Sequence, residues 1–139
     1  MNTLFLLASL TAGALAQNAA IGLPKAQESI QAGANNLVVQ VQRPNTLTGS
    51  EEVAVVIGIQ SCADSPCRDP KDVMGHILYN GPFKPVYHEA SLPPYQNFTV
   101  TVPKSVGAGK AVIGVAHVAL VGAGPFPMLQ TLEQSVQIA

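Results

Sequence analysis

The sequence predicts an all-β protein, an immunoglobulin-like two-sheet β-sandwich of about seven strands. Short runs rich in Val, Ile and Thr alternate with clusters of Pro, Gly and Asn, and no segment shows a helical period. Hydrophobic residues make up 47% of the 139 residues and charged residues 11%, which suits a small domain with a sizeable core and few surface ion pairs. A closed barrel is the alternative arrangement of the same strands.

The chain begins with a predicted secretory signal peptide, residues 1–16, and residues 17–139 are predicted to form one β-sandwich domain. An apolar stretch at positions 4–10 is followed by small residues and the ending Ala14-Leu15-Ala16. This stretch is too short to span the roughly 30 Å of hydrocarbon in a bilayer. We therefore expect a secreted, extracellular protein without membrane insertion.

The front half of the predicted domain supplies three strands. A weak first strand is expected within residues 21–30, and residues 37–42 alternate apolar and Gln side chains before Pro44-Asn45 ends the run. Residues 51–60 form the third, in which both faces are small or apolar, as is typical of a central strand. Its inward face is predicted to carry Val53, Val55, Ile57 and Ile59.

Four further strands are expected in the back half. Residues 69–95 are rich in proline and should be mostly irregular, with one short strand at residues 76–79. Residues 95–103 alternate strictly, which places Phe98, Val100 and Val102 inward. The longest apolar run, residues 109–121, and the C-terminal run then form the last two strands, the latter with Leu132, Val136 and Ile138 on one face.

Charge and metal-ligand patterns argue against several function classes. Seven basic and eight acidic residues give a formal charge of −1 without any run of like charge, so neither nucleic acid nor an anionic membrane is an expected partner. The three histidines, His76, His88 and His117, are not at metal-ligand spacing. His117 lies within a β-run, where a hydrogen-bonded core histidine is more common than a ligand.

Motifs for nucleotide binding and catalysis are incomplete. The segment KSVGAGKA lacks the first Gly of a P-loop, and VGAGPFP lacks the third Gly of a dinucleotide-binding turn. There is no G-x-S-x-G elbow, and the acidic residues do not suggest a catalytic pair. We therefore expect a protein that is not an enzyme and that needs no cofactor or metal; a secreted enzyme with an unrecognised site is a remote alternative.

Two sites of covalent modification are predicted. Cys62 and Cys67 are the only cysteines and, in a secreted chain, are expected to form a disulfide that shapes a loop. Asn97-Phe98-Thr99 is an N-glycosylation sequon, and the strand alternation turns Asn97 outward. A glycan on Asn97 is therefore expected, away from any partner surface.

The Gly- and Pro-rich segment between the last two strands is predicted to be a hairpin turn. Its glycines can adopt positive φ, and its prolines stiffen the exit. Phe126 either folds back to cap the core, which we favour, or projects as an apolar anchor. Together with the proline-rich loop before residue 95, this turn is the candidate partner surface, formed by Tyr79, Phe83, Tyr87, Gly122, Gly124, Pro125, Phe126 and Pro127.

The segments LYNGPFKPVYHE, PPYQNFTVTVP and GKAVIGVAHVALVGAGPFPMLQTLEQSVQI resemble the necrosis-inducing secreted protein family of fungi. The resemblance covers residues 75–138 most specifically. It implies a small effector that acts on a plant host by contacting immune receptor kinases, suppresses pattern-triggered immunity and in some settings provokes cell death. It implies no catalytic residues, and the cysteine-containing insert has no place in the family pattern.

A secreted carbohydrate-binding module for cell-wall glycans is the alternative function, because secreted β-sandwiches often bind glycans. Such sites usually present flat aromatic platforms. The chain has no Trp, three Tyr and four Phe, and therefore offers little material for such a platform.

Overall fold

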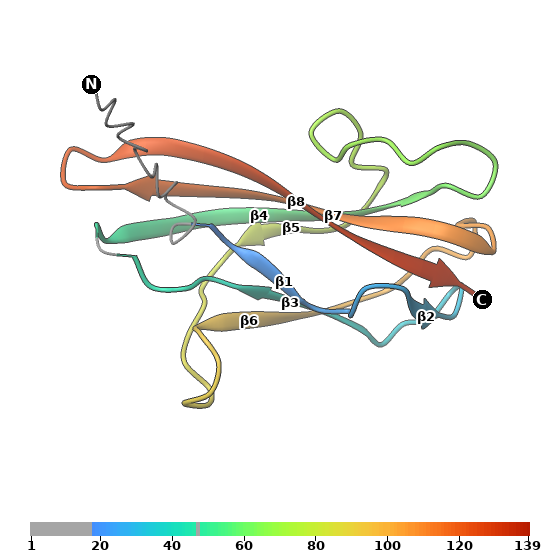
Figure 1. Cartoon of the computed structure of the whole chain (residues 1–139), viewed down its shortest axis with the longest axis horizontal. Coiled ribbons are helices and arrows are strands. Elements are labelled where there is room, and N and C mark those ends of the chain that lie inside the picture. The colour runs from blue at the N-terminus through green and yellow to red at the C-terminus, as the bar shows by residue number, and fades with distance from the viewer. Residues whose placement is uncertain (1–17, 47) are drawn as a thin grey trace, which may run out of the picture.

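The computed structural model describes residues 18–46 and 48–139, and it contains eight strands in two sheets (Figure 1). The predicted signal peptide lies outside the described residues. No helix in the described ranges is long and apolar enough to cross a membrane. The strands are β1 (Ala20–Leu23), β2 (Glu28–Ile30), β3 (Leu37–Gln42), β4 (Ser50–Ser61), β5 (His76–Pro82), β6 (Tyr95–Val100), β7 (Gly109–Val121) and β8 (Phe126–Ile138).

The strands form a β-sandwich, as predicted. One sheet has the order β1-β3-β6 and the other the order β2-β8-β7-β4-β5. The pairings between these strands are antiparallel except that of β2 with β8, which is parallel. The single weak strand expected in residues 21–30 is in fact two strands, because the chain pairs first with β3 and then crosses to β8 in the opposite sheet.

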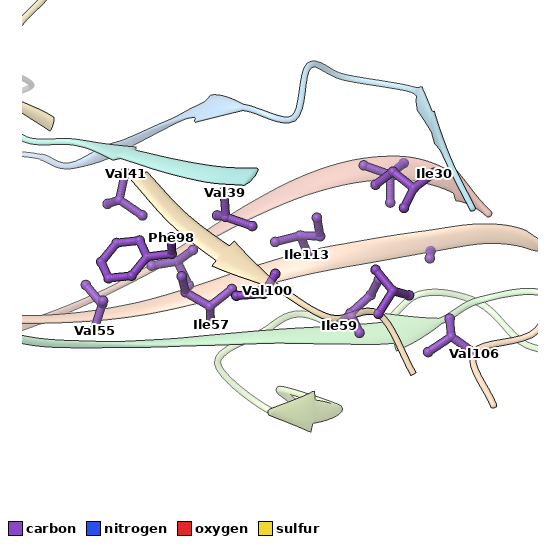
Figure 2. Close-up of a cluster of buried hydrophobic side chains, with 14 of the residues drawn as sticks. Ile30, Val39, Val41, Val55, Ile57, Ile59, Phe98, Val100, Val106 and Ile113 are labelled. Atoms are coloured by element: carbon purple, nitrogen blue, oxygen red, sulfur yellow. The ribbon is translucent and has the colours of Figure 1, made fainter. Parts of the chain in front are cut away.

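The core lies between the inward faces of the two sheets (Figure 2). Val39, Val41 and Phe98 come from the smaller sheet, and Ile57 and Ile113 face them from the larger sheet. All five are at most 4% exposed. Burying a side chain of this size contributes about 1.5–3 kcal/mol, so this alternation of apolar residues is the main source of stability.

A β-bulge in β4 corrects one predicted orientation. The pairing of β4 with β7 shifts between Glu52 and Ala54, so Val53 is the extra residue. Val53 was expected in the core, but it is 45% exposed. Glu52 turns inward instead, where its carboxylate meets His117 of β7.

The predicted bridge between Cys62 and Cys67 is present. It closes a ring at the start of the loop of residues 62–75, which folds over the outer face of the larger sheet. Gln60 holds this loop by donating to the carbonyls of Arg68 and Val73 and accepting from the amide of Arg68. Met74 and Pro70 of this loop lie against Gly58 and Gly114, a pair on β4 and β7 away from the β7–β8 turn.

Replacing both cysteines with Ser is expected to lower the free energy of unfolding by about 2 kcal/mol, because the bridge closes a short ring in the unfolded chain. The side chain of Gln60 should keep the loop in place and preserve the fold. Chemical denaturation of the double variant measures the change. Two free thiols in the secreted wild-type protein would contradict the assignment of the bridge.

Candidate protein-binding surface

Three connections gather at one end of the sandwich and form a surface that we call the loop end. They are the β3–β4 loop (residues 43–49), the β5–β6 loop (residues 83–94) and the β7–β8 turn (residues 122–125). In Figure 1 the turn of the hairpin and the β3–β4 loop lie together at the left end. Variable immunoglobulin domains use connections at the corresponding end to bind antigen, although this analogy concerns the fold alone.

Hydrogen bonds join these connections to one another. The Gly122 amide donates to the Gly49 carbonyl over 3.2 Å, linking the β7–β8 turn to the β3–β4 loop. The Arg43 amide donates to the Pro94 carbonyl over 2.8 Å, and the Asn45 side chain donates to the Tyr87 hydroxyl. The β3–β4 loop therefore connects the β5–β6 loop and the β7–β8 turn, the two segments predicted to form the partner surface.

A buried cluster of charged and polar side chains lies beneath the loop end. The Arg43 Nε donates to Glu52 Oε1 over 2.6 Å, and its Nη2 donates to the Ser50 hydroxyl over 3.1 Å. The other carboxylate oxygen of Glu52 accepts from His117 Nε2. The side chains of Arg43, Glu52 and His117 are 4%, 11% and 0% exposed. The cluster ties together the ends of β3, β4 and β7 from which the loops depart.

The electrostatics of this cluster keep Glu52 ionised. Burial by itself raises the pKa of the Glu52 carboxyl, but the hydrogen bonds and positive charges of His117 and Arg43 together outweigh it and lower the pKa to about 2. A buried carboxylate is tolerated only when it is paired in this way. Glu52 is therefore the shared partner of the two basic side chains in the cluster.

His117 is the hydrogen-bonded core histidine expected from its β-run. Its ring packs edge-on against Phe83, with the centroids 5.5 Å apart and an interplanar angle of 86°. The Nδ1 atom is buried and has no hydrogen-bond partner among the described residues. No group of three or more His, Cys, Asp or Glu side chains suited to a metal ion occurs within the described part of the chain.

The aromatic residues predicted for the candidate surface differ in how far they are exposed to solvent. Phe83 is 1% exposed and packs against His117, so its proposed place on a partner surface is wrong. Tyr79 is half-buried, with its ring 4.4 Å from that of Phe98 and its hydroxyl bonded to the Pro82 carbonyl. Tyr87 is 62% exposed on the β5–β6 loop. Of these three residues, only Tyr87 exposes most of its side chain to a binding partner.

The β7–β8 turn is the predicted hairpin connection, and it presents Phe126 to solvent. Gly122 has a φ of +81°, a conformation that favours glycine. Phe126 was expected to cap the core, but it is 55% exposed. The β7–β8 hairpin extends past the strands of the smaller sheet (Figure 1). The turn residues Gly122, Gly124 and Pro125 and the first residues of β8, Phe126 and Pro127, are all exposed.

Two hollows flank the β3–β4 loop. One, of about 600 Å³, opens between this loop and the β7–β8 turn and is lined by residues that include Leu120, Ala123 and Pro125. The other, of about 480 Å³, opens toward the β5–β6 loop, with Pro85 and Pro94 in its lining and the polar cluster in its floor. An apolar and a polar recess thus lie side by side on the loop end.

Sequence reasoning missed Arg43 and Glu52. The pair Glu51-Glu52 at the start of an apolar strand indicated that one carboxylate turns inward. Alternation from Val55 and Ile57 points to Glu51, and only the bulge at Val53 turns Glu52 inward instead. The partners of that inward carboxylate could not be predicted from the sequence, because Arg43 lies just after β3 and His117 lies in β7.

Asn97 lies on β6, exposed and paired with Gln40 on the outer face of the smaller sheet. This position can accept a glycan without disturbing the core, and it lies on the sheet opposite the one that carries the β7–β8 hairpin. We expect Asn97→Gln to increase the electrophoretic mobility of the secreted protein, because the glycan would be lost. Unchanged mobility would show that the sequon is not used.

Comparison with known proteins gives one informative result. The model of the Nis1 family matches residues 14–137, which is nearly the whole chain. No curated protein matches the chain. The family match is consistent with the resemblance to necrosis-inducing secreted effectors that the back half of the sequence shows.

Proposed function

The chain belongs to the Nis1 family, and on that premise we propose that it is a secreted fungal effector that binds plant immune receptor kinases. Binding suppresses pattern-triggered immunity and, in some settings, leads to host cell death. The family membership carries this proposal, because it supports an effector-like role over the whole length of the predicted domain. The proposed activity is binding without catalysis, and it takes place outside the fungal cell.

The loop end is the surface that we assign to the receptor kinase. It combines two exposed aromatic side chains, Phe126 at 55% and Tyr87 at 62%, with an apolar hollow between the β3–β4 loop and the β7–β8 turn. A buried charge cluster fixes the loops. Aromatic anchors on a preorganised surface supply a large share of binding energy at protein interfaces. The predicted glycan on Asn97 lies on the smaller sheet and leaves this surface open.

Co-precipitation of the secreted protein with the domains of plant immune receptor kinases tests the proposal. We expect specific capture of at least one kinase, which should be lost when the loop end is altered. Failure to bind any of them would overturn it. Retention on chitin, cellulose or β-glucan instead would favour the alternative function, a carbohydrate-binding module for the cell wall.

A further inference from the structure

Over most of its length, the outer edge of β8 has no strand paired with it in the described part of the chain. Within the described residues, β2 pairs with β8 only from Val136 to Ile138, and no other strand pairs with this edge. The N-terminal strand β1 pairs with β3 of the smaller sheet. The residues that flank β1 contact side chains of β8, since the Ala19 amide donates to Gln130 Oε1 and the Gln134 side chain donates to the Pro24 carbonyl. An open edge of this kind offers unpaired backbone donors and acceptors to another strand.

The direction of these backbone groups follows from three observations. The Ser135 carbonyl accepts from the Gln27 amide, and the Ala139 amide donates to the Ile30 carbonyl, so odd-numbered residues direct their groups toward the β2 side. The pairing of β8 with β7 has no register shift, so the alternation continues to the turn. Pro127, which has no N–H, is also odd-numbered. The free edge therefore presents the amides of Leu129, Thr131 and Glu133.

The side chains along this edge are compatible with pairing between the β8 strands of two molecules. From Phe126 to Leu132 the strand carries no charge and has neither a lysine nor a bulge. Of the features that commonly protect an edge, this stretch has one proline, Pro127, near its start. Leu129 is 70% exposed and lies next to Val118 of β7 on the outer face of the sheet. Glu133, the first charged residue along the strand, lies three residues beyond Gln130.

We propose that two copies of this chain dimerise by antiparallel pairing of their β8 edges, with the two-fold axis at Gln130. This register joins the two larger sheets into one continuous sheet. Leu129 then pairs with Thr131 of the second copy, and Glu133 pairs with Pro127 of the second copy. The amides of Leu129, Thr131 and Glu133 all find carbonyl acceptors, and the two Leu129 side chains meet diagonally across the axis.

The register avoids contacts between like charges. Each Glu133 faces a proline rather than the other Glu133, and the uncharged segment lies at the centre of the pairing. Pro127 falls at the end of the paired segment, where its missing donor leaves only the Glu133 carbonyl of the second copy to water. The dimer is thus self-complementary, as a two-fold interface must be. The proposal does not depend on kinase binding.

Sedimentation velocity and native mass spectrometry of the secreted protein over a wide concentration range test the proposal. We expect a reversible monomer–dimer equilibrium. Hydrogen exchange read at single residues should show protection of the Leu129, Thr131 and Glu133 amides that increases with protein concentration. The amides of Met128 and Gln130, which face β7, should be protected at every concentration. A monomer at all concentrations would overturn the proposal.

Leu129→Lys and Ile77→Lys provide a matched pair of variants. Leu129→Lys brings two like charges together across the axis and should weaken dimerisation about 100-fold or more. Ile77 is 55% exposed on β5, the opposite edge strand of the same sheet, and Ile77→Lys should leave the dimer intact. The reverse pattern would place the interface on β5 and refute the assignment to β8. The exchange measurement on the wild-type protein holds even if a variant fails to fold.

Discussion

Glu52→Gln is expected to lower the free energy of unfolding by about 3 kcal/mol. Removing one partner of a buried ion pair leaves an uncompensated buried charge, and such changes typically cost 3–5 kcal/mol. Glutamine keeps the size of the side chain and part of its hydrogen bonding, so we expect the lower end of this range. Arg43, at 4% exposure, and His117, at 0%, would both lose their carboxylate. Urea denaturation monitored by circular dichroism measures the difference.

The neighbouring residue supplies the control. Glu51 is exposed, and it pairs with Leu120 across β4 and β7. Glu51→Gln removes the same charge from the surface and should change the free energy of unfolding by no more than about 0.5 kcal/mol. Equal changes in the free energy of unfolding for the two substitutions would mean that the buried cluster does not stabilise the fold.

The same cluster predicts how stability depends on pH. The Glu52 carboxyl has a pKa of about 2 in the folded protein, below its ordinary value of 4.5. A group whose pKa is depressed by folding stabilises the protein fully above its unfolded pKa, and this contribution is lost as pH falls toward the folded value. Stability should therefore decline between about pH 4.5 and pH 2, and Glu52→Gln should flatten this part of the profile.

Phe126→Ala is expected to weaken binding to the receptor kinase by about 2 kcal/mol, or roughly 30-fold, while the melting temperature barely changes. The side chain is 55% exposed at the start of β8, so truncation removes a binding anchor but little of the core. We expect a loss of stability below about 1 kcal/mol. Titration calorimetry and thermal melting of the same preparation separate the two effects.

Ile77→Ala is the matched control for Phe126→Ala. Ile77 has the same exposure of 55%, but its strand pairs there with Gly58 and Ile59, toward the end of the sheet opposite the loop end. Truncating Ile77 should leave kinase binding unchanged. A large stability loss in Phe126→Ala, with binding otherwise intact, would return Phe126 to a role in the core.

Much of the fold follows from local alternation in the sequence. The strict period of two in residues 95–103 places Phe98, Val100 and Val102 inward, and all three are at most 5% exposed. Side chains alternate across a strand whatever the strand pairs with, so a single run of sequence contains this information. The disulfide could also be predicted from the sequence, because a secreted chain with two cysteines allows only one pairing within the chain.

The candidate site depended on tertiary structure. The bulge at Val53 turned Glu52 inward. A bulge is defined by the pairing with the neighbouring strand, so it depends on the register between β4 and β7. The burial of Phe83 and the exposure of Phe126 depend on how far each sheet extends over the other, which no local pattern encodes. Arg43 lies just after β3, Glu52 in β4 and His117 in β7, and only packing brings these side chains into contact. Local periodicity thus determined which faces of most strands are apolar, whereas the buried charges and the open edge of β8 followed from strand order and register, which are long-range properties of the folded chain.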